Sequence, residues 1–240
     1  MNVAKLEKLV GYKFGDPDLL TRSVTHRSWA HENFPGESEE RIREAQNESM
    51  EFVGDSVVGL VIAEELYRKH PTLSEGDLTL MKHQLVSTTT LAKIAGSLGL
   101  GQFVRMGRGE EKTGGRQKPA ILADTLEAVI AAIFFDGGYA SATAFITRVF
   151  AKELKKTTPE SSLDYKTMLQ EVLQAEKLST PTYSLIKTEG LPHARTFLVE
   201  AAWGDEKSTG TGGSIKSAEM MAASEALKSL QKQKQKVSKR

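Results

Sequence analysis

Carboxylates recur inside two strongly apolar stretches of this 240-residue chain. The first stretch, residues 47–65, reads NESMEFVGDSVVGLVIAEE and contains Glu48, Glu51 and Asp55. At about 100° per residue, this spacing places the three acids on one narrow face of a helix. Carboxylates on a largely buried helix repel one another and resist loss of water. They stay ionised only beside a cation, either an arginine or lysine or a metal ion.

The second stretch, residues 119–135, reads PAILADTLEAVIAAIFF and contains the pair Asp124 and Glu127. If the two helices pack side by side, Glu51, Asp55, Asp124 and Glu127 converge on one oxygen-rich pocket. Oxygen ligands suit Mg²⁺ or Mn²⁺, and magnesium held in this way is typical of phosphoryl-transfer chemistry. The alternative is that each acid is neutralised by its own arginine or lysine, or lies on the protein surface.

Helices must position these acids, and the pattern around them predicts an all-helical region. Apolar residues fall on nearly every side of 47–65, which predicts a helix buried all round. They are Met50, Phe52, Val53, Val57, Val58, Leu60, Val61 and Ile62. We expect further helices within 1–30 (Asp16 as an N-cap), at 74–86 (Ser74 as N-cap), at 88–98 and at 139–154, with a polar connection at 31–46 and an ordered loop at 107–119.

The pattern changes after a polar, proline-containing segment. We expect a helix at 164–175, strands at 182–187, 196–203 and 206–211, and a final helix at 217–230. The predicted fold class is therefore an all-α N-terminal domain followed by a small α+β domain of order α-β-β-β-α. The predicted divisions are a domain at 1–155, a linker at 156–163, a domain at 164–231 and a basic tail at 232–240.

Composition excludes several classes of protein. Cysteine is absent, so the chain has no disulfide and no thiolate metal site. The net charge is +1, and the last nine residues carry five basic and no acidic side chains, so the remainder has a net charge of −4. Only the tail has the charge of a nucleic-acid binder. Neither a signal peptide nor a membrane-spanning run is visible, so we expect a cytoplasmic protein with no membrane partner.

Four segments resemble the ribonuclease III family. They are NESMEFVGDSVVGL, LLTRSVTHRSW at 19–29, GRGEEKTGGRQKPAILADTLEAVIAAIFFDGG at 107–138, and a C-terminal part similar to a double-stranded-RNA-binding domain. The resemblance implies a homodimeric, Mg²⁺-dependent endoribonuclease, with Mn²⁺ able to substitute and no organic cofactor. Its substrates would be double-stranded RNA in ribosomal RNA precursors and other structured transcripts, and its products would carry 5′-phosphate and 3′-hydroxyl ends.

The resemblance also implies roles for individual residues. The family's metal-binding acids match Glu51, Asp124 and Glu127, and its catalytic acids match Asp55 and Glu127. Supporting acids match Glu48 and Glu75, and an aromatic residue of the dimer interface matches Phe52. RNA contacts match Gln170, Glu171, His193 and Lys216; where the family has a basic residue before that lysine, this chain has Ile215.

Other interpretations remain open on the sequence. His26 could bind a metal or act as a base, but no second histidine lies at ligand spacing, which favours a hydrogen-bonded structural role. A double-stranded-RNA-binding regulator that does not cleave would need the C-terminal domain but not the carboxylates. A DNA nuclease using the same acids would cut duplex DNA as well.

Overall fold

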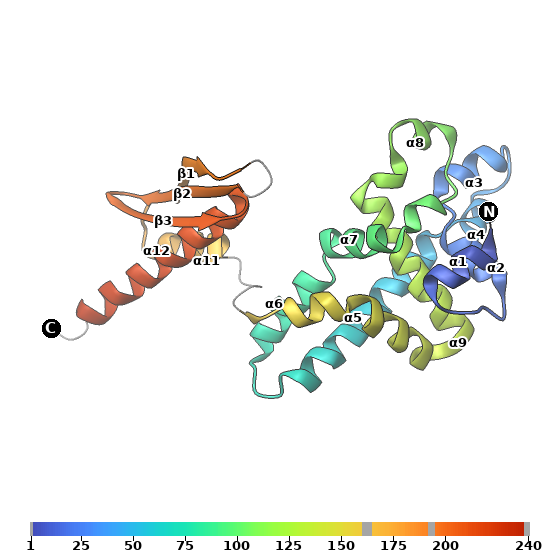
Figure 1. Cartoon of the computed structure of the whole chain (residues 1–240), viewed down its shortest axis with the longest axis horizontal. Helices are drawn as coiled ribbons and strands as arrows, with labels where there is room; N and C mark the ends of the chain where they lie inside the picture. Colours follow the sequence, from blue (N-terminus) through green and yellow to red (C-terminus); the bar gives the residue numbers. More distant parts are fainter. Residues whose placement is uncertain (1, 160–164, 192–194, 238–240) are drawn as a thin grey trace. The chain divides into compact units, whose positions relative to one another are not determined.

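A computed structural model of the chain describes residues 2–159, 165–191 and 195–237, and side chains as far as Leu230. It divides into two compact units, Met1–Ser162 and Leu163–Arg240 (Figure 1). Residues 160–164, which cover the end of the predicted linker and the first residue of the predicted second domain, and 238–240, in the predicted tail, lie outside the described residues. The domain boundaries expected from the sequence stay a prediction.

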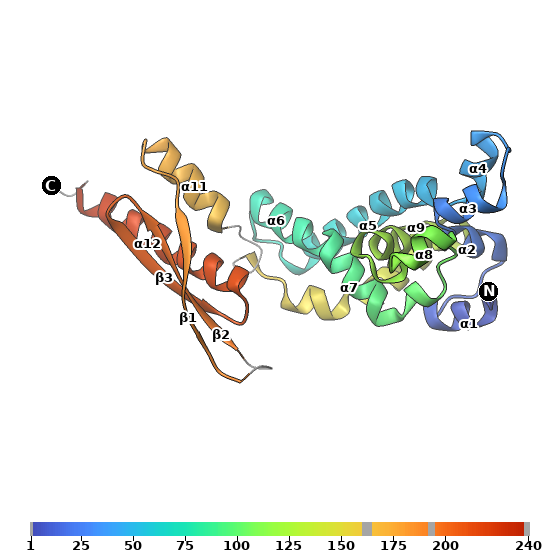
Figure 2. The same ribbon diagram turned by 90° about the horizontal axis from the view of Figure 1, so that it is seen from above.

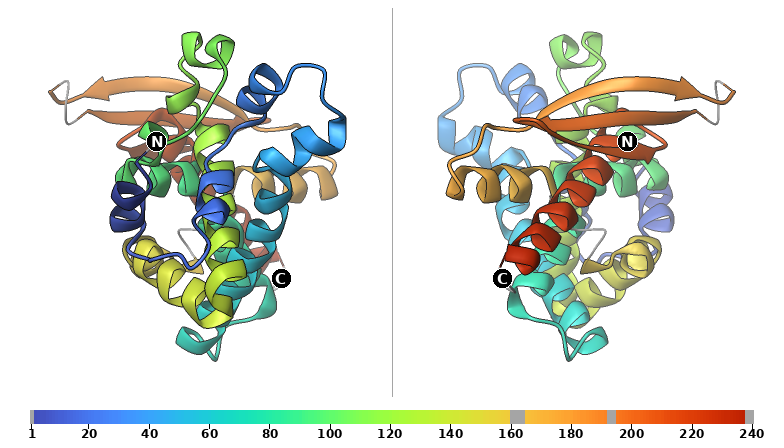
Figure 3. Two further views of the ribbon diagram at one scale, coloured as in Figure 1. Left: turned by 90° about the vertical axis from the view of Figure 1, so that its right-hand side faces the viewer. Right: turned by 90° about the vertical axis from the view of Figure 1, so that its left-hand side faces the viewer.

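The described part of the N-terminal unit is built from helices, as predicted. The two long helices, α5 and α9, pack along each other, and α7 packs on α9 (Figures 2 and 3). The helices are α1 (Val3–Val10), α2 (Pro17–Ser23), α3 (Arg27–Asn33), α4 (Glu39–Ala45), α5 (Glu48–Lys69), α6 (Glu75–Leu85), α7 (Thr88–Leu98), α8 (Arg108–Lys112) and α9 (Pro119–Lys156), with 3₁₀ turns at Leu100–Gln102 and Gly115–Gln117.

Side-chain caps fix where several of these helices begin. The Asp16 carboxylate accepts a hydrogen bond from the backbone N–H of Asp18, and the Ser74 hydroxyl accepts one from Asp77. Both predicted N-caps are confirmed. The polar connection expected at 31–46 is wrong in part, because Ser38 caps the short helix α4, which buries Ile42. The loop expected at 107–119 likewise contains α8 and a 3₁₀ turn.

The helix α9 changes direction at Gly138, whose φ of 73° and ψ of −175° are not helical. Only glycine adopts such a conformation without strain. Just before this kink, the Asp136 carboxylate accepts hydrogen bonds from the backbone N–H groups of Gly15 and Asp16 and from the Tyr12 hydroxyl. The helix expected at 139–154 thus begins after this kink. The hydrogen bonds of Asp136 fasten the loop ahead of α2 to α9.

The expectation that α5 is buried all round is wrong. One face of the helix enters the core, but Phe52, Leu60 and Tyr67 are 75%, 58% and 68% exposed. Their separations of eight and seven residues keep these three side chains on one side of a helix. We call them the outer stripe. Helical periodicity could not separate this stripe from the core because both are apolar.

The C-terminal unit consists of α11 (Tyr165–Ala175), β1 (Thr182–Glu189), β2 (Thr196–Trp203), β3 (Glu206–Gly212) and α12 (Ile215–Val237). The strands form an antiparallel sheet in the order β1-β2-β3, and both helices cover one of its faces (Figure 1). Trp203 from the sheet packs against Leu173 of α11 and Leu227 of α12. The predicted α-β-β-β-α order is confirmed, although α12 continues beyond the expected end at residue 230.

Candidate metal centre

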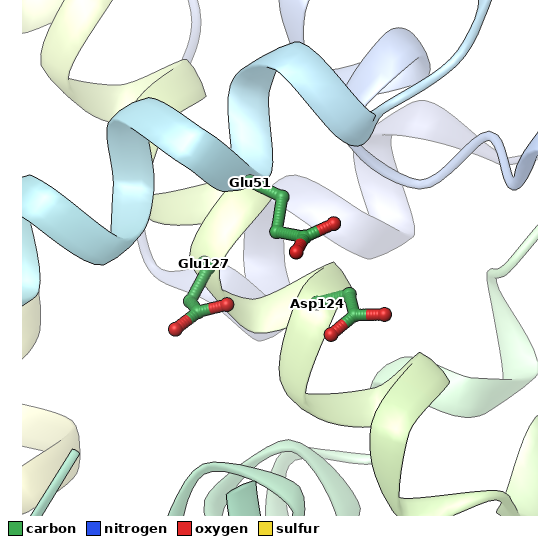
Figure 4. Close-up of side chains that lie close together, drawn as sticks. All are labelled: Glu51, Asp124 and Glu127. Carbon is green, nitrogen blue, oxygen red and sulfur yellow. The ribbon is translucent and has the colours of Figure 1, made fainter. Parts of the chain in front are cut away.

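Three acidic side chains from the two central helices meet at one point. Glu51 comes from α5, and Asp124 and Glu127 come from successive turns of α9; Figure 4 shows the three side chains close together between the two helices. One carboxylate oxygen from each residue lies within 4.8 Å of the others. Glu127 is only 8% exposed, and the other two acids are partly buried. Of the four acids expected to converge, these three do, whereas Asp55 is exposed and is not part of the group.

The close approach of α5 and α9 depends on Gly54, which lies between Glu51 and Asp55. A Cβ atom on this residue would stand 1.9 Å from the backbone oxygen of Glu127. The backbones of the two helices therefore touch beside the acids. Gly54 was not singled out from the sequence, although a glycine inside an apolar helix often marks such a close approach.

The electrostatics of the cluster reflect burial and mutual repulsion. Burial, followed by the charges of Asp55, Glu51 and Asp124, raises the pKa of Glu127 to about 8. Burial and then the neighbouring acids, Asp124 first among them, raise the pKa of Glu51 to about 6. Burial also raises the pKa of Asp124, and the charge of Glu48 adds to the shift. Without a cation, these carboxyl groups hold their protons more tightly than in water.

Within the described part of the chain, no lysine or arginine forms an ion pair with Glu51, Asp124 or Glu127. The ion pairs of that part lie elsewhere, and the nearest one joins Arg27 to Glu48 at 3.3 Å. Three converging carboxylate oxygens without a cationic partner are a donor set for a hard divalent ion. The residues present therefore fit a divalent metal better than they fit separate salt bridges.

Glu48 and Asp55 flank the cluster on α5. Glu48 is exposed and is held by Arg27 and by the Gln46 side-chain amide, which donates to its carboxylate at 2.8 Å. Asp55 is exposed too, and it lines a hollow of about 460 Å³ that Lys82 and His83 of α6 also line. Its charge contributes to the raised pKa of Glu127. Asp55 thus lies near the buried acids but remains accessible to solvent.

Hydrogen bonds fix the beginning of α5, one turn before Glu51. The backbone N–H of Asn47 donates to Thr25 O at 3.0 Å, and the Asn47 side-chain amide donates to Ser23 O at 3.3 Å. The Arg22 guanidinium donates to Gln46 O at 3.1 Å and to the Ser49 hydroxyl at 2.7 Å. These anchors tie the first turn of α5 to the end of α2 and the residues that follow it. No local pattern predicts these hydrogen bonds, because they join segments that are distant in the chain.

Other residues selected from the sequence lie away from the cluster. Glu75 is in the first turn of α6 and is not one of the three converging acids. Phe52 belongs to the outer stripe. The His26 ring accepts from the backbone N–H of Ser28 and caps α3, which confirms its hydrogen-bonded structural role.

The predicted RNA-contacting residues belong to the C-terminal unit. Gln170 and Glu171 lie exposed on α11, and Lys216 is exposed in the first turn of α12. Ile215 beside it is 44% exposed. His193 lies outside the described residues. Their role in RNA binding stays a prediction.

No helix within the described residues combines the length and the apolar character needed to cross a bilayer.

Known proteins resemble both units. Residues 16–154 match the family described as ribonuclease-III-like, and residues 165–230 match the double-stranded RNA binding motif. The ribonuclease 3 of Thermobifida fusca is 43% identical over 233 residues, covering 95% of this chain and 92% of the relative. That of Carboxydothermus hydrogenoformans is 41% identical and covers 98% of each chain. The solved nuclease domain of ribonuclease III from Campylobacter jejuni is 39% identical, with a TM-score of 0.56, covering 63% of this chain and 97% of that one.

Proposed function

The chain belongs to the ribonuclease III family and is an endoribonuclease for double-stranded RNA, and we propose that it works as a Mg²⁺-dependent homodimer. The observation that carries this proposal is the convergence of three carboxylates, within 4.8 Å, in the unit that matches the nuclease family. We further propose that it acts in the cytoplasm on ribosomal RNA precursors and other structured transcripts, and leaves 5′-phosphate and 3′-hydroxyl ends.

Glu51, Asp124 and Glu127 are the proposed metal ligands. When bound there, Mg²⁺ (or Mn²⁺ in its place) supplies a Lewis acid that stabilises negative charge on the phosphate and activates water. The protein's contribution is to hold the three oxygens together, with Glu127 buried and Glu51 and Asp124 partly buried. The rigid contact of α5 with α9 at Gly54 supports this function, because it fixes the separation of the ligands.

Asp55 and Glu127 are the proposed catalytic acids. Asp55 is exposed beside the cluster, so it can accept or release a proton at the surface that RNA approaches. Glu127 is buried and has a raised pKa, so a cation is needed to keep it ionised near neutral pH. Glu48 is proposed as a supporting acid whose negative charge adds to the attraction for a cation. The same charge raises the pKa of Glu51 and Asp124, and Arg27 fixes the position of Glu48. Glu75 is proposed as a second supporting acid.

The outer stripe is the proposed dimer contact. An exposed line of two aromatic residues and a leucine on α5 is unusual for a surface that faces only water. The solved Campylobacter jejuni nuclease domain contains a region involved in dimer formation. Two cuts on opposite strands of a duplex require two sites related by a two-fold axis. Phe52, the most exposed residue of the stripe, is the proposed centre of the contact.

The C-terminal unit is the proposed means of holding RNA. Such domains bind about 16 base pairs through two minor grooves and the major groove between them. Gln170 and Glu171 are the proposed contacts to one minor groove, His193 to the other, and Lys216 to phosphates. From Asp164 to Gln231 the chain has seven basic and nine acidic residues. We therefore expect weak binding by this unit alone, with a shallow salt dependence.

A labelled RNA hairpin tests the proposal against its alternatives. With Mg²⁺, the wild-type protein is expected to cleave the hairpin, whereas Glu127→Gln is expected to bind it and leave it whole. Duplex DNA of the same sequence is expected to remain intact. Binding without cleavage by the wild-type protein would favour a regulator, and equal cleavage of DNA would favour a DNA nuclease.

A further inference from the structure

A second hollow in the N-terminal unit combines basic and aromatic side chains. It measures about 440 Å³ and is lined by residues of α1, α3 and the segment that follows the first 3₁₀ turn. Lys5, Trp29, Phe103, Arg105 and Arg116 are among its lining residues. No described carboxylate lines it. Cavities of this size accommodate small organic ligands.

The backbone around Arg105 directs its side chain into this hollow. Val104 and Met106 pack against Ile121 of α9 and also border the hollow, and the side chain of Arg105 between them is partly exposed there. The backbone N–H of Arg105 donates to Val24 O at 2.7 Å, and its carbonyl accepts from His26 N at 2.9 Å. The position of Arg105 is thus fixed by hydrogen bonds on both sides.

The Arg105 guanidinium is placed for recognising an anion. Its central carbon lies 3.5 Å from the centre of the Trp29 ring, and Nη1 donates to the Thr25 hydroxyl at 3.4 Å. Neither Arg105 nor Lys5 forms an ion pair with any residue that the structure describes. A guanidinium stacked on an aromatic ring still presents its N–H edge to a phosphate.

The third basic residue of the hollow already has partners. Arg116 pairs with Glu111 at 2.6 Å and donates to the carbonyls of Gly101 and Val104, each at 2.9 Å. Two positive charges, those of Lys5 and Arg105, therefore remain beside an aromatic wall. Trp29, which is partly buried, forms most of this wall, and Phe103 adds the small part of its ring that is exposed (8%). Positive charge next to aromatic surface is the combination that recognises a phosphate together with a base.

We propose that this hollow binds a phosphorylated nucleotide, with its phosphate against Arg105 and Lys5 and its base against the aromatic wall. The nucleotide is either free in solution or an unpaired residue of an RNA strand; only the second source depends on the proposed function. A base inside a duplex is stacked on its neighbours, so a paired nucleotide does not enter. The hollow is separate from the three converging acids.

Nuclear magnetic resonance of the full-length protein tests this proposal, because the chain contains only two tryptophans, Trp29 and Trp203. Trp203 is buried in the other unit and serves as an internal reference. Addition of guanosine monophosphate, without metal, is expected to shift the Trp29 indole signal in a saturable way and to leave that of Trp203 unchanged. Trp29→Phe assigns the signals.

Variants distinguish a nucleotide-binding role of Arg105 from a purely structural stacking of Arg105 on Trp29. Arg105→Gln is expected to weaken nucleotide binding at least about tenfold, because it removes a charge-assisted hydrogen bond. Arg108→Gln, an exposed arginine outside the hollow, is the matched control and is expected to bind like the wild type. An RNA arm compares a blunt duplex with one bearing unpaired 3′ nucleotides, again without metal.

The two arms identify the source of the nucleotide. If an RNA strand supplies the nucleotide, the duplex with unpaired 3′ nucleotides binds more tightly than the blunt duplex. Arg105→Gln then removes this difference and leaves the binding of the blunt duplex unchanged. If the nucleotide is free, guanosine monophosphate binds and the unpaired nucleotides add nothing. The proposal is overturned if Trp29 is unaffected by the nucleotide and the unpaired nucleotides add no Arg105-dependent affinity. Binding of the blunt duplex, or cleavage when Mg²⁺ is supplied, reports separately on the proposed function.

Discussion

Glu127 is the residue whose environment differs most from water among the acids of the metal centre. It is nearly buried, three other carboxylates act on it, and its pKa is raised to about 8. Burial without a counter-charge is unfavourable for an ionised carboxylate, and it is tolerated when a cation binds there. Protons and a metal ion should therefore compete for Glu127.

Metal binding is expected to strengthen with pH. The pKa is raised to about 6 for Glu51 and to about 8 for Glu127, so each carboxyl group keeps its proton at pH values below its own pKa. Protons therefore compete with the metal for these groups at low pH. The rise in melting temperature caused by Mn²⁺ should therefore grow from pH 6 to pH 8.5, as measured by calorimetry. A metal effect that is constant across this range would contradict the proposed ligands.

The metal-free protein is expected to show the opposite trend. A carboxyl group with a pKa raised by folding binds its proton more tightly in the folded state. The stabilising contribution of Glu127 is therefore complete below its ordinary pKa of 4.5 and is lost as the pH rises through about 8. In the presence of a chelator, Glu127→Gln should reduce this loss of stability between pH 5 and pH 8.5.

The neutral variant Glu127→Gln is also expected to keep the fold while losing the metal. Above about pH 8, where the wild-type carboxyl group is ionised, the amide removes one charge and its repulsion, so the metal-free melting temperature there should be equal to or higher than that of the wild type. Stabilisation by Mn²⁺ should disappear. The matched control is Glu44→Gln, an exposed glutamate on α4 paired with Arg41, whose effect on stability should stay within about 0.5 kcal/mol. A large metal effect in Glu127→Gln would count against the site.

The four acids could be found from the sequence because their spacing on apolar helices is itself the signal. Gly54 could not be assigned a role, because its function is to admit the backbone of α9, which is far away in the chain. The hydrogen bond between Asn47 and Thr25 could not be predicted for the same reason. Local spacing shows which side chains share a face, whereas contacts between distant segments need the folded structure.

At the scale of elements, the contact of α5 with α9 can be tested directly. Gly54→Ala places a methyl group where only 1.9 Å is available to the Glu127 backbone oxygen. The helices must move apart, which should cost about 1–3 kcal/mol or more and weaken metal binding. Chemical denaturation measures the first effect, and the Mn²⁺-induced shift in melting temperature measures the second.

Gly96→Ala in α7 is the matched control for that substitution. A Cβ at Gly96 meets no atom within 4 Å, so alanine there should be neutral or stabilise by up to about 1 kcal/mol. If both alanine variants behave alike, the helix contact at Gly54 does not constrain the site. A loss of stability and of metal binding in Gly54→Ala but not in Gly96→Ala would support the role of the close helix contact at Gly54.

Elements with strong periodicity or clear caps were predictable, and short ones were not. Ser74 and Asp16 begin their helices as expected, and the three strands form close to their expected bounds. The helix α4 was missed because its seven residues carry mostly charged side chains and bury only Ile42. Its stability comes from the cap at Ser38 and from packing, since an isolated helix of that length is unstable in water.

At the scale of the whole molecule, the outer stripe predicts self-association. Phe52→Ala removes a large apolar contact from each copy of a two-fold interface, at about 1.5–3 kcal/mol per copy. The dimer dissociation constant should rise at least about a hundredfold. Analytical ultracentrifugation measures it, and Leu178→Ala, an exposed leucine of the C-terminal unit, should leave it unchanged. An unchanged constant for Phe52→Ala would place the dimer contact elsewhere.

The sequence predicted an all-helical part followed by an α-β-β-β-α part, because the periodicity changes after residue 163. It could not distinguish the outer stripe from core, because a surface covered by a partner is as apolar as an interior. The outer stripe of α5 was therefore assigned to the core because its residues are apolar, and the same apolar character makes the stripe the proposed dimer contact.

Anomalous diffraction from crystals soaked in Mn²⁺ tests the central claim most directly. The account predicts an anomalous peak within bonding distance, about 2.0–2.3 Å, of oxygens from Glu51, Asp124 and Glu127, and its loss in Glu127→Gln. A crystal structure with no peak at these acids, and with a lysine or arginine bonded to each of them instead, would contradict it.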